Sequence, residues 1–127
     1  KEPAMLILIA EDNQDNFELM ARFLKRRGHE VSCATTAREA IEKAAAERPA
    51  VILMDVSLPD LSGLEATKRI RGDKALAKTP IIAVTAHAMD GDRARCMAAG
   101  CDGYLSKPID YEALAALIDS LTSSAPA

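Results

Sequence analysis

Five side chains suited to binding a metal ion and a phosphate stand at the ends of short apolar runs. The runs at 6–10, 51–54, 81–84 and 104–106 lead in turn to Glu11 and Asp12, to Asp55, to Thr85 and to Lys107. Three carboxylates, a hydroxyl and an amine thus each stand just after an apolar run. If the fold brings the ends of these runs together, the five groups form one polar site.

The types of these groups indicate metal-assisted phosphate chemistry. Like charges 4 Å apart cost about 4 kcal/mol at an effective dielectric constant of 20, so clustered carboxylates require a cation or bound protons. Oxygen ligands favour Mg²⁺, or alternatively Mn²⁺ or Ca²⁺, over zinc. An ammonium and a hydroxyl would bind phosphoryl oxygens, and a carboxylate can itself be the nucleophile. Asp55, alone at the end of its run, is the candidate for an aspartyl-phosphate.

Each of these residues also has an ordinary explanation. An Asp after a strand is commonly a loop or helix-capping residue, and the pair Glu11-Asp12 could cap the next helix. Thr85 could be a polar strand residue, and Lys107, before Pro108, a surface lysine. Chance would rarely place five such residues at one edge of one sheet, so the sequence favours a phosphate-binding site.

Strand-like and helix-like segments alternate along the chain. Phe17, Met20 and Leu24 have helical spacing, Gly28 is suited to ending that helix, and Thr36 and Glu39 form a capping-box pattern. We expect strands at 5–10, 30–34, 51–55, 81–85 and 103–106. We expect helices at 15–27, from 36 to just before Pro49, at 64–71, 90–99 and 110–121.

This alternation predicts an α/β fold with a parallel sheet between two layers of helices, because uniformly apolar strands are typical of sheets covered on both faces. A flavodoxin-like, doubly wound sheet would have the strand order 2-1-3-4-5. Its ligand site lies outside the carboxyl ends of the strands, where the strand order reverses. In this order the reversal lies between strands one and three, so Glu11, Asp12 and Asp55 are expected to converge.

Length and composition are those of one water-soluble domain. The chain has 127 residues, of which 49% are hydrophobic and 28% charged, with a net charge of −3. We expect the domain at 5–121, an added or trimmed edge at 1–4, and a flexible tail or linker stub at 122–127. The absence of a basic stripe with aromatic residues argues against direct nucleic-acid binding, and the sequence predicts no membrane span.

Cysteine usage predicts a reducing, cytoplasmic location. Cys33, Cys96 and Cys101 are an odd set without paired spacing, as expected for free thiols. Cys96 and Cys101 could form half of a zinc site, but the sequence supplies no second Cys/His pair for the usual four ligands.

Four motifs give the chain a resemblance to a known family. They are Leu8–Asn13, Leu53–Gly63, Val84–Ala86 and Gly103–Pro108. In order and spacing they resemble the receiver domains of bacterial two-component response regulators, and the resemblance covers residues 5–121. It implies a phosphorylation-activated signalling switch in a phosphorelay, with self-catalysed phosphotransfer and autodephosphorylation rather than enzymatic turnover.

The resemblance implies a role for each residue of the site. Asp55 would accept phosphate from a histidine kinase or a histidine phosphotransfer protein. Mg²⁺ would be held by Glu11, Asp12, Asp55 and the backbone carbonyl of Ser57. Lys107, joined to Pro108 by a cis peptide bond, would pair with the phosphoryl group. Glu11 stands where many members have Asp, and its longer side chain would reach the metal through water.

Other residues would carry the signal and tune its lifetime. Thr85 would move towards the phosphoryl group, Tyr104 would turn inward behind it, and the face around residues 86–106 would change. A downstream protein would bind the face from strand four to helix five. Ser57 and His87 would tune autodephosphorylation. Whether phosphorylation produces a homodimer is left open by the sequence.

Alternative functions are weaker but distinct. One is a receiver domain excised from a hybrid histidine kinase or a multidomain regulator. A second is an aspartate-nucleophile phosphatase, which typically has another Asp two residues after the nucleophile, where this chain has Ser57. A third is a flavodoxin-like cofactor binder, but the acidic loop at 11–15 would repel a cofactor phosphate.

Overall fold

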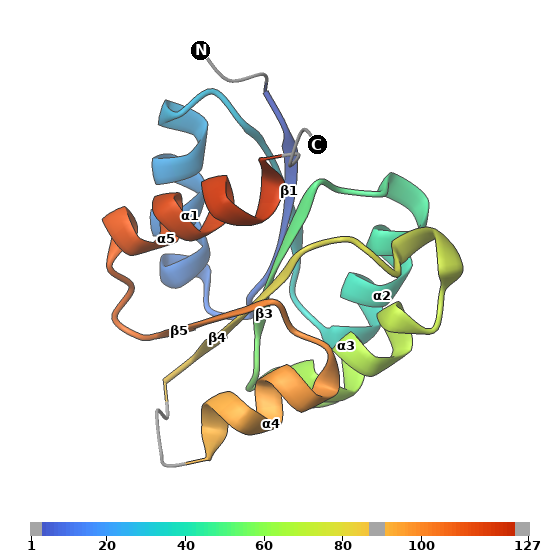
Figure 1. The fold of residues 1–127 in the computed structure, drawn as a ribbon. Helices are drawn as coiled ribbons and strands as arrows, with labels where there is room; N and C mark the ends of the chain where they lie inside the picture. Colours follow the sequence, from blue (N-terminus) through green and yellow to red (C-terminus); the bar gives the residue numbers. More distant parts are fainter. Residues whose placement is uncertain (1–3, 87–90, 124–127) are drawn as a thin grey trace.

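A parallel β-sheet forms the centre of the protein, shown here by a computed structural model that describes residues 4–86 and 91–123. Within those residues the sheet has five strands in the order β2-β1-β3-β4-β5 (Figure 1). The strands are β1 (Leu6–Ala10), β2 (Glu30–Ala34), β3 (Val51–Asp55), β4 (Ile81–Thr85) and β5 (Gly103–Ser106). This confirms the predicted flavodoxin-like fold and its strand order.

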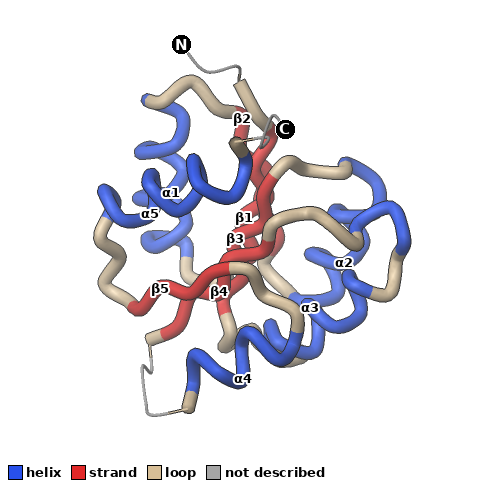
Figure 2. The backbone as a smooth tube through the Cα atoms, viewed as in Figure 1, coloured by secondary structure: helices blue, strands red, loops and turns tan. Residues whose placement is uncertain are grey.

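Helices cover both faces of the sheet. They are α1 (Gln14–Arg26), α2 (Ala37–Glu47), α3 (Gly63–Arg71), α4 (Asp92–Ala99) and α5 (Tyr111–Thr122), with a short 3₁₀ helix, η1 (Lys74–Leu76). Helices α1 and α5 lie on one side of the sheet, and α2, α3 and α4 lie on the other (Figures 1 and 2). Among the described residues, no helix is both long and apolar enough to span a membrane.

The central strands β1, β3 and β4 are apolar up to their last residues because their side chains alternate between two cores. Ile9 and Leu53 belong to the core under α1 and α5, together with Met20, Leu24, Leu114 and Ile118. Leu8 and Met54 belong to the core under α2, α3 and α4, together with Ala40, Ala66 and Cys96. Side chains of the sheet therefore anchor both helical layers, and the strand ends have fixed positions.

Local capping sets the helix boundaries. The Asn13 side chain accepts the N–H of Asn16 at 2.9 Å and begins α1, and the Thr36 hydroxyl accepts the N–H of Glu39 at 3.0 Å and begins α2. Gly28 follows the end of α1 with φ +93°, a conformation that glycine adopts without steric cost. The expected boundaries differ from the observed ones by one or two residues. The sequence analysis missed η1, a single turn capped by Asp73.

The strand register brings the ends of the central strands level. Ala10 pairs with Met54, Asp55 with Val84, and Thr85 with Ser106. The residues that follow β1, β3, β4 and β5 therefore emerge at the same edge of the sheet.

Candidate metal and phosphate site

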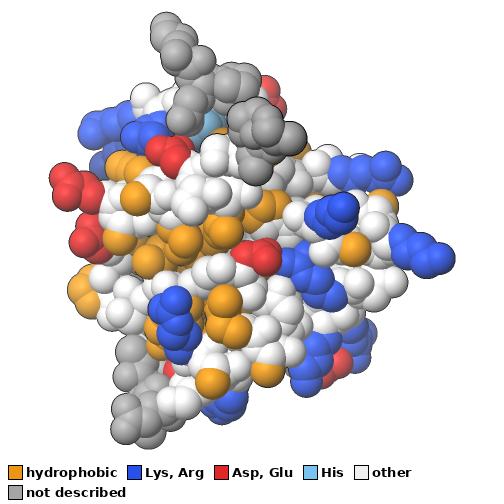
Figure 3. Space-filling model, viewed as in Figure 1, with side chains coloured by type: hydrophobic (Ala, Val, Ile, Leu, Met, Phe, Trp, Pro, Cys, Tyr) orange, Lys and Arg blue, Asp and Glu red, His pale blue; other side chains and the backbone are white. Residues whose placement is uncertain are grey.

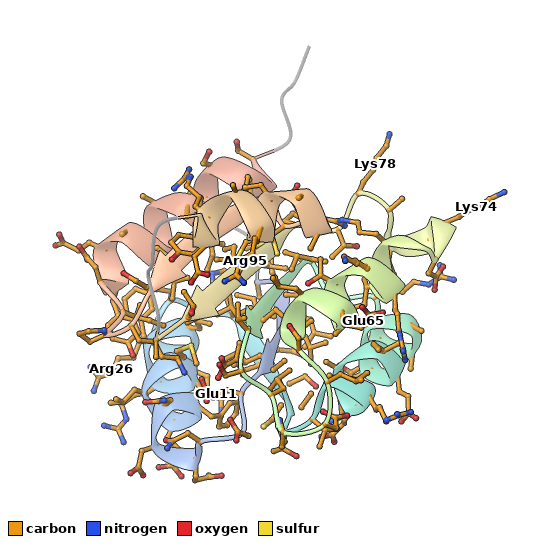
Figure 4. All side chains as sticks on the ribbon, turned by 90° about the horizontal axis from the view of Figure 1, so that it is seen from below. Glu11, Arg26, Glu65, Lys74, Lys78 and Arg95 are labelled. Carbon is orange, nitrogen blue, oxygen red and sulfur yellow. The ribbon has the colours of Figure 1, made fainter. Side chains whose placement is uncertain are left out.

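Three carboxylates meet at this edge. Glu11, Asp12 and Asp55 each offer an oxygen atom, and these atoms lie within 4.8 Å of one another. Glu11 and Asp55 are buried, with 2% and 4% of their surface exposed, whereas Asp12 is exposed. Figure 4 shows Glu11 beyond the end of the sheet, close to α1. The site therefore has a buried side, next to the core, and one carboxylate on the solvent side.

Lys107 supplies the positive charge opposite these acids. Its Nζ donates to Glu11 Oε1 at 2.8 Å and to Asp55 Oδ2 at 3.1 Å. Its backbone N–H donates to the carbonyl of Thr85 at 2.7 Å, which ties the end of β5 to the end of β4. The peptide bond from Lys107 to Pro108 is cis. One ammonium thus joins residues that are 96 and 52 positions away in the chain.

Backbone amides hold the remaining carboxylate oxygens. Glu11 Oε2 accepts the N–H of Asn13 at 3.1 Å, and Asp55 Oδ1 accepts the N–H of Ser57 at 2.8 Å. Asn13, rather than either neighbouring acid, caps α1 with its side chain. Both buried acids are therefore oriented by an amide on one oxygen and by Lys107 on the other.

The electrostatics follow from this arrangement. Burial raises the pKa of Glu11, and the nearby charge of Asp55 adds to that rise, although the hydrogen bonds from Lys107 and Asn13 act to lower it. Burial acts to lower the pKa of Lys107, but its hydrogen bonds to Glu11 and Asp55 outweigh burial and hold that pKa above its ordinary value. The lysine therefore stays charged, and its single positive charge offsets only part of the negative charge of the three carboxylates.

The donor set fits a hard divalent cation. Carboxylate oxygens are the preferred ligands of Mg²⁺, which binds few protein groups and keeps several waters. Three acids balanced by one lysine leave negative charge that a cation would neutralise. Glu11 and Asp55 each already bond two protein groups, so the exposed Asp12 is the carboxylate most open to an incoming ion.

The structure describes three of the other residues singled out from the sequence, Ser57, Thr85 and Tyr104. Thr85 is buried at the end of β4, with 2% of its surface exposed. Tyr104 is half-buried in β5 and packs against the core under α2, α3 and α4. Ser57 follows Asp55 and is exposed. His87 lies outside the described residues.

Sequence reasoning missed two residues that shape the site. Asn13 both caps α1 and donates its N–H to Glu11. Gly63 lies so close to the Asp55 backbone that a Cβ there would be 2.0 Å from the Asp55 carbonyl oxygen. A glycine directly after the loop that follows an acid-tipped strand was the available signal, since glycine allows another backbone to approach closely.

Comparison with known proteins identifies the family of this chain. A family model described as the response regulator receiver domain matches residues 7–119. The chain belongs to the response regulator receiver family. It is also similar to the polar-differentiation response regulator DivK of Brucella anthropi, with 44% identity over 103 residues that cover 81% of this chain and 84% of the relative.

Solved receiver domains share the fold. The receiver domain of the sensor histidine kinase PA1611 from Pseudomonas aeruginosa, crystallised with a magnesium ion in its active-site cleft, superposes with a TM-score of 0.89 and 35% identity, covering 96% of this chain and all of that one. The receiver domain of Ssk1 from Saccharomyces cerevisiae, in complex with the phosphotransfer protein Ypd1, gives a TM-score of 0.86 and 30% identity, covering 94% and 90%. This receiver domain therefore belongs to two-component signalling.

Proposed function

We propose that this receiver domain is a phosphorylation-activated switch in which Asp55 accepts a phosphoryl group from a phosphohistidine. The observation that carries the proposal is the Lys107 ammonium between Glu11 and Asp55, beside three carboxylates whose oxygens lie within 4.8 Å. A nucleophile, a counter-charge and a cation-binding set thus occupy one edge of the sheet. The donor is a histidine kinase or a histidine phosphotransfer protein.

The transfer is a displacement at phosphorus. Asp55 Oδ2 or Oδ1 forms the new O–P bond while the N–P bond of the phosphohistidine breaks, and the departing imidazole keeps the bond electrons and takes a proton from solvent. Lys107 neutralises charge on the transferred oxygens, and the Thr85 hydroxyl donates a hydrogen bond to one of them. Attack of water on the acyl phosphate later restores Asp55.

A divalent cation completes the site. Glu11, Asp12, Asp55 and the backbone carbonyl of Ser57 would hold Mg²⁺, or Mn²⁺ in its place. The cation supplies charge neutralisation for the phosphoryl oxygens. The magnesium in the PA1611 receiver domain supports this assignment.

The signal travels from Thr85 towards Tyr104. A phosphoryl group adds about −1.5 to −2 charge and three acceptor oxygens. Thr85 shifts towards that group and leaves space, which the half-buried ring of Tyr104 fills. The phosphoryl group thereby stabilises a conformation of residues 86–106 that the unmodified domain populates weakly. Ser57 and His87 set how quickly water removes the phosphate.

A groove beside Lys107 suits the phosphodonor. It has a volume of about 140 Å³ and is lined by Asn16, Leu19, Met20, Lys107, Pro108, Ile109 and Tyr111. Leu19 on α1 lines this groove and is 53% exposed, so its apolar side chain is open to a partner. A helix that carries the donor histidine would cover Leu19 while presenting the phosphohistidine to Asp55. The complex of the Ssk1 receiver with Ypd1 supports a partner of this class.

The downstream target binds the face made by α4, β5 and α5. A second groove there is lined by Arg93, Tyr104, Leu105, Leu117 and their neighbours. Figure 3 shows hydrophobic side chains gathered over α5 and β5 on this face. Because Tyr104 lies in this groove, a change in its position alters the surface that a target contacts. Light scattering before and after phosphorylation measures whether a second copy binds this face.

Mass spectrometry tests the phosphoacceptor. Incubation with acetyl phosphate and Mg²⁺ should add the mass of one phosphoryl group to the intact protein, and peptide mapping should place it on Asp55. Asp55→Asn should show no such adduct, and Asp12→Asn should show slower formation. Acetate release by turnover, without an adduct at any time, would support a phosphatase instead. Absence of both reactions would contradict the proposal.

A further inference from the structure

Asp60 links the loop after Asp55 to a different helix. The loop at 56–62 joins β3 to α3, and Asp60 lies in it. Its Oδ1 accepts the N–H of Ala37 at 2.7 Å and its Oδ2 accepts the N–H of Arg38 at 3.0 Å, both in the first turn of α2. These hydrogen bonds lower the pKa of the Asp60 carboxyl, against the effect of desolvation. The carboxylate also lies at the positive end of the helix dipole.

This link is additional to the ordinary cap of α2. Thr36 already accepts the N–H of Glu39, and the Glu39 carboxylate accepts the N–H of Thr35 at 2.8 Å. The helix therefore has its own local capping residues. Asp60, 23 and 22 residues away from the amides that it bonds, contributes a connection between two segments rather than a local helix signal.

The same part of α2 is tied to the other side of the acidic site. The N–H of Glu11 donates to the carbonyl of Ala34 at 2.9 Å, and Ala34 is three residues before Ala37. The turn between β2 and α2 therefore contacts the loop after β1 through Ala34 and the loop after β3 through Asp60. This turn therefore links the segments after β1 and β3, and these two segments supply the three carboxylates.

The loop that Asp60 anchors contributes to the site. The N–H of Ser57 donates to Asp55 Oδ1 at 2.8 Å, and Leu58 is buried in the core beneath α2. At the far end, the N–H of Gly63 donates to the carbonyl of Val56 at 2.9 Å. The loop is thus fixed at its base and by Leu58. In its outer part Leu61 packs against the same core, and Asp60 adds the hydrogen bonds that join the loop to α2.

We propose that Asp60 is a positioning residue that fixes the loop at 56–62 against α2, and so holds the Ser57 backbone in place for cation binding beside Asp55. This inference rests on the proposed function, because it assigns Asp60 a role in the same cation site. Asp60 acts through Ser57 and does not itself contact the phosphoryl group.

Cation affinity tests the proposal without any turnover. Titration with Mn²⁺, followed by the electron paramagnetic resonance of the free ion, should give a dissociation constant about tenfold higher for Asp60→Ala than for the wild type. This is the lower end of the loss seen when residues that orient metal ligands are removed. Asp60→Asn, which keeps one acceptor oxygen, should lie between them.

Thr36→Ala is the matched control. It removes a cap from the same turn of α2 but leaves the contacts of Asp60 in place, so it should lower stability while the Mn²⁺ dissociation constant stays within about twofold of the wild type. Arg38→Ala, which removes only the exposed 3.8 Å ion pair to Asp60, should behave likewise. Hydrogen exchange of the Ser57 amide should accelerate in Asp60→Ala and not in Thr36→Ala.

The outcomes separate the two proposals. Wild-type affinity and unchanged Ser57 exchange in Asp60→Ala would overturn the role of Asp60 while leaving the phosphorylation switch intact. An equal loss of affinity in Thr36→Ala would also overturn it, since helix stability would then explain the effect. A wild-type protein that neither binds Mn²⁺ nor forms the Asp55 adduct would overturn both.

Discussion

At the scale of single residues, Lys107 determines the charge state of the site. It contacts both buried carboxylates, and its ammonium is largely buried itself, with 18% of its side chain exposed. One positive charge does not balance three negative ones, so the domain holds its acids at an energetic cost that a bound cation would relieve. The site thus carries an electrostatic imbalance that arises from four residues, the three carboxylates and Lys107.

Cys101 gives a residue-scale prediction for stability at high pH. Burial raises the pKa of its thiol from 9.0 to about 11. The folded protein therefore keeps this thiol neutral while the unfolded chain ionises, so the stabilising contribution is present below pH 9 and is lost as the pH rises towards 11. The loss is on the order of 2 kcal/mol, from 1.36 kcal/mol per pKa unit.

Urea unfolding under reducing conditions measures this effect. Cys101→Ala should lose less stability between pH 8 and pH 11 than the wild type, because the other alkaline groups, such as Lys107 and Tyr111, are common to both proteins. Parallel curves for the two proteins would show that Cys101 does not carry the dependence.

At the scale of elements, Arg71 connects three segments at the end of the sheet far from Asp55. Its Nε donates to the carbonyl of Gly100 at 2.9 Å, and its Nη1 donates to the carbonyls of Leu76 and Thr79 at 3.0 and 2.7 Å. Its Nη2 bonds Asp102 at 2.6 Å. Whereas Lys74 and Lys78 project into solvent (Figure 4), Arg71 joins α3 to η1 and to the turn before β5.

Replacing Arg71 should therefore destabilise the domain without affecting the surroundings of Asp55. Arg71→Lys removes the planar fork and leaves carbonyl groups without donors, so the free energy of unfolding should fall by about 2 kcal/mol. Arg69→Lys is the control, because the exposed Arg69 side chain has a single ion pair within the described residues, to Glu65 at 3.5 Å; its effect should be within about 0.5 kcal/mol. Denaturant unfolding gives both values, and equal effects would refute the role of Arg71.

The strands and local caps could be predicted from the sequence, whereas the long-range contacts of Asp60 and Arg71 could not. The strands were predictable because runs such as Val51–Met54 are apolar on both faces, and their alternation with helices determines a parallel sheet. Local caps such as Thr36 were visible as short motifs. The contacts of Asp60 with α2 and of Arg71 with Gly100 were not, because they join residues more than 20 positions apart through backbone groups, which any residue type can supply. Periodicity carries no information on such pairs.

At the scale of the whole molecule, the order of the strands in the sheet determines where the site forms. The strand order reverses between the parallel strands β1 and β3, whose carboxyl ends lie side by side, and register brings β4 and β5 level with them. The three carboxylates meet only when β1 and β3 are paired in the folded sheet. A cation that binds them therefore binds the folded state and not the unfolded chain.

Folding stability should consequently increase with Mg²⁺. A ligand present at about 100 times its dissociation constant stabilises the folded state by about 2.7 kcal/mol, so the Tm should rise by several degrees relative to NaCl at equal ionic strength.

Asp12→Asn removes the exposed carboxylate and one like charge. Its Tm without Mg²⁺ should match or exceed that of the wild type, while its Mg²⁺-dependent rise should be much smaller. Glu47→Gln, an exposed substitution at the end of α2, should keep the full rise. Calorimetry with and without Mg²⁺ measures each value, and an equal rise in Asp12→Asn and the wild type would place the cation elsewhere.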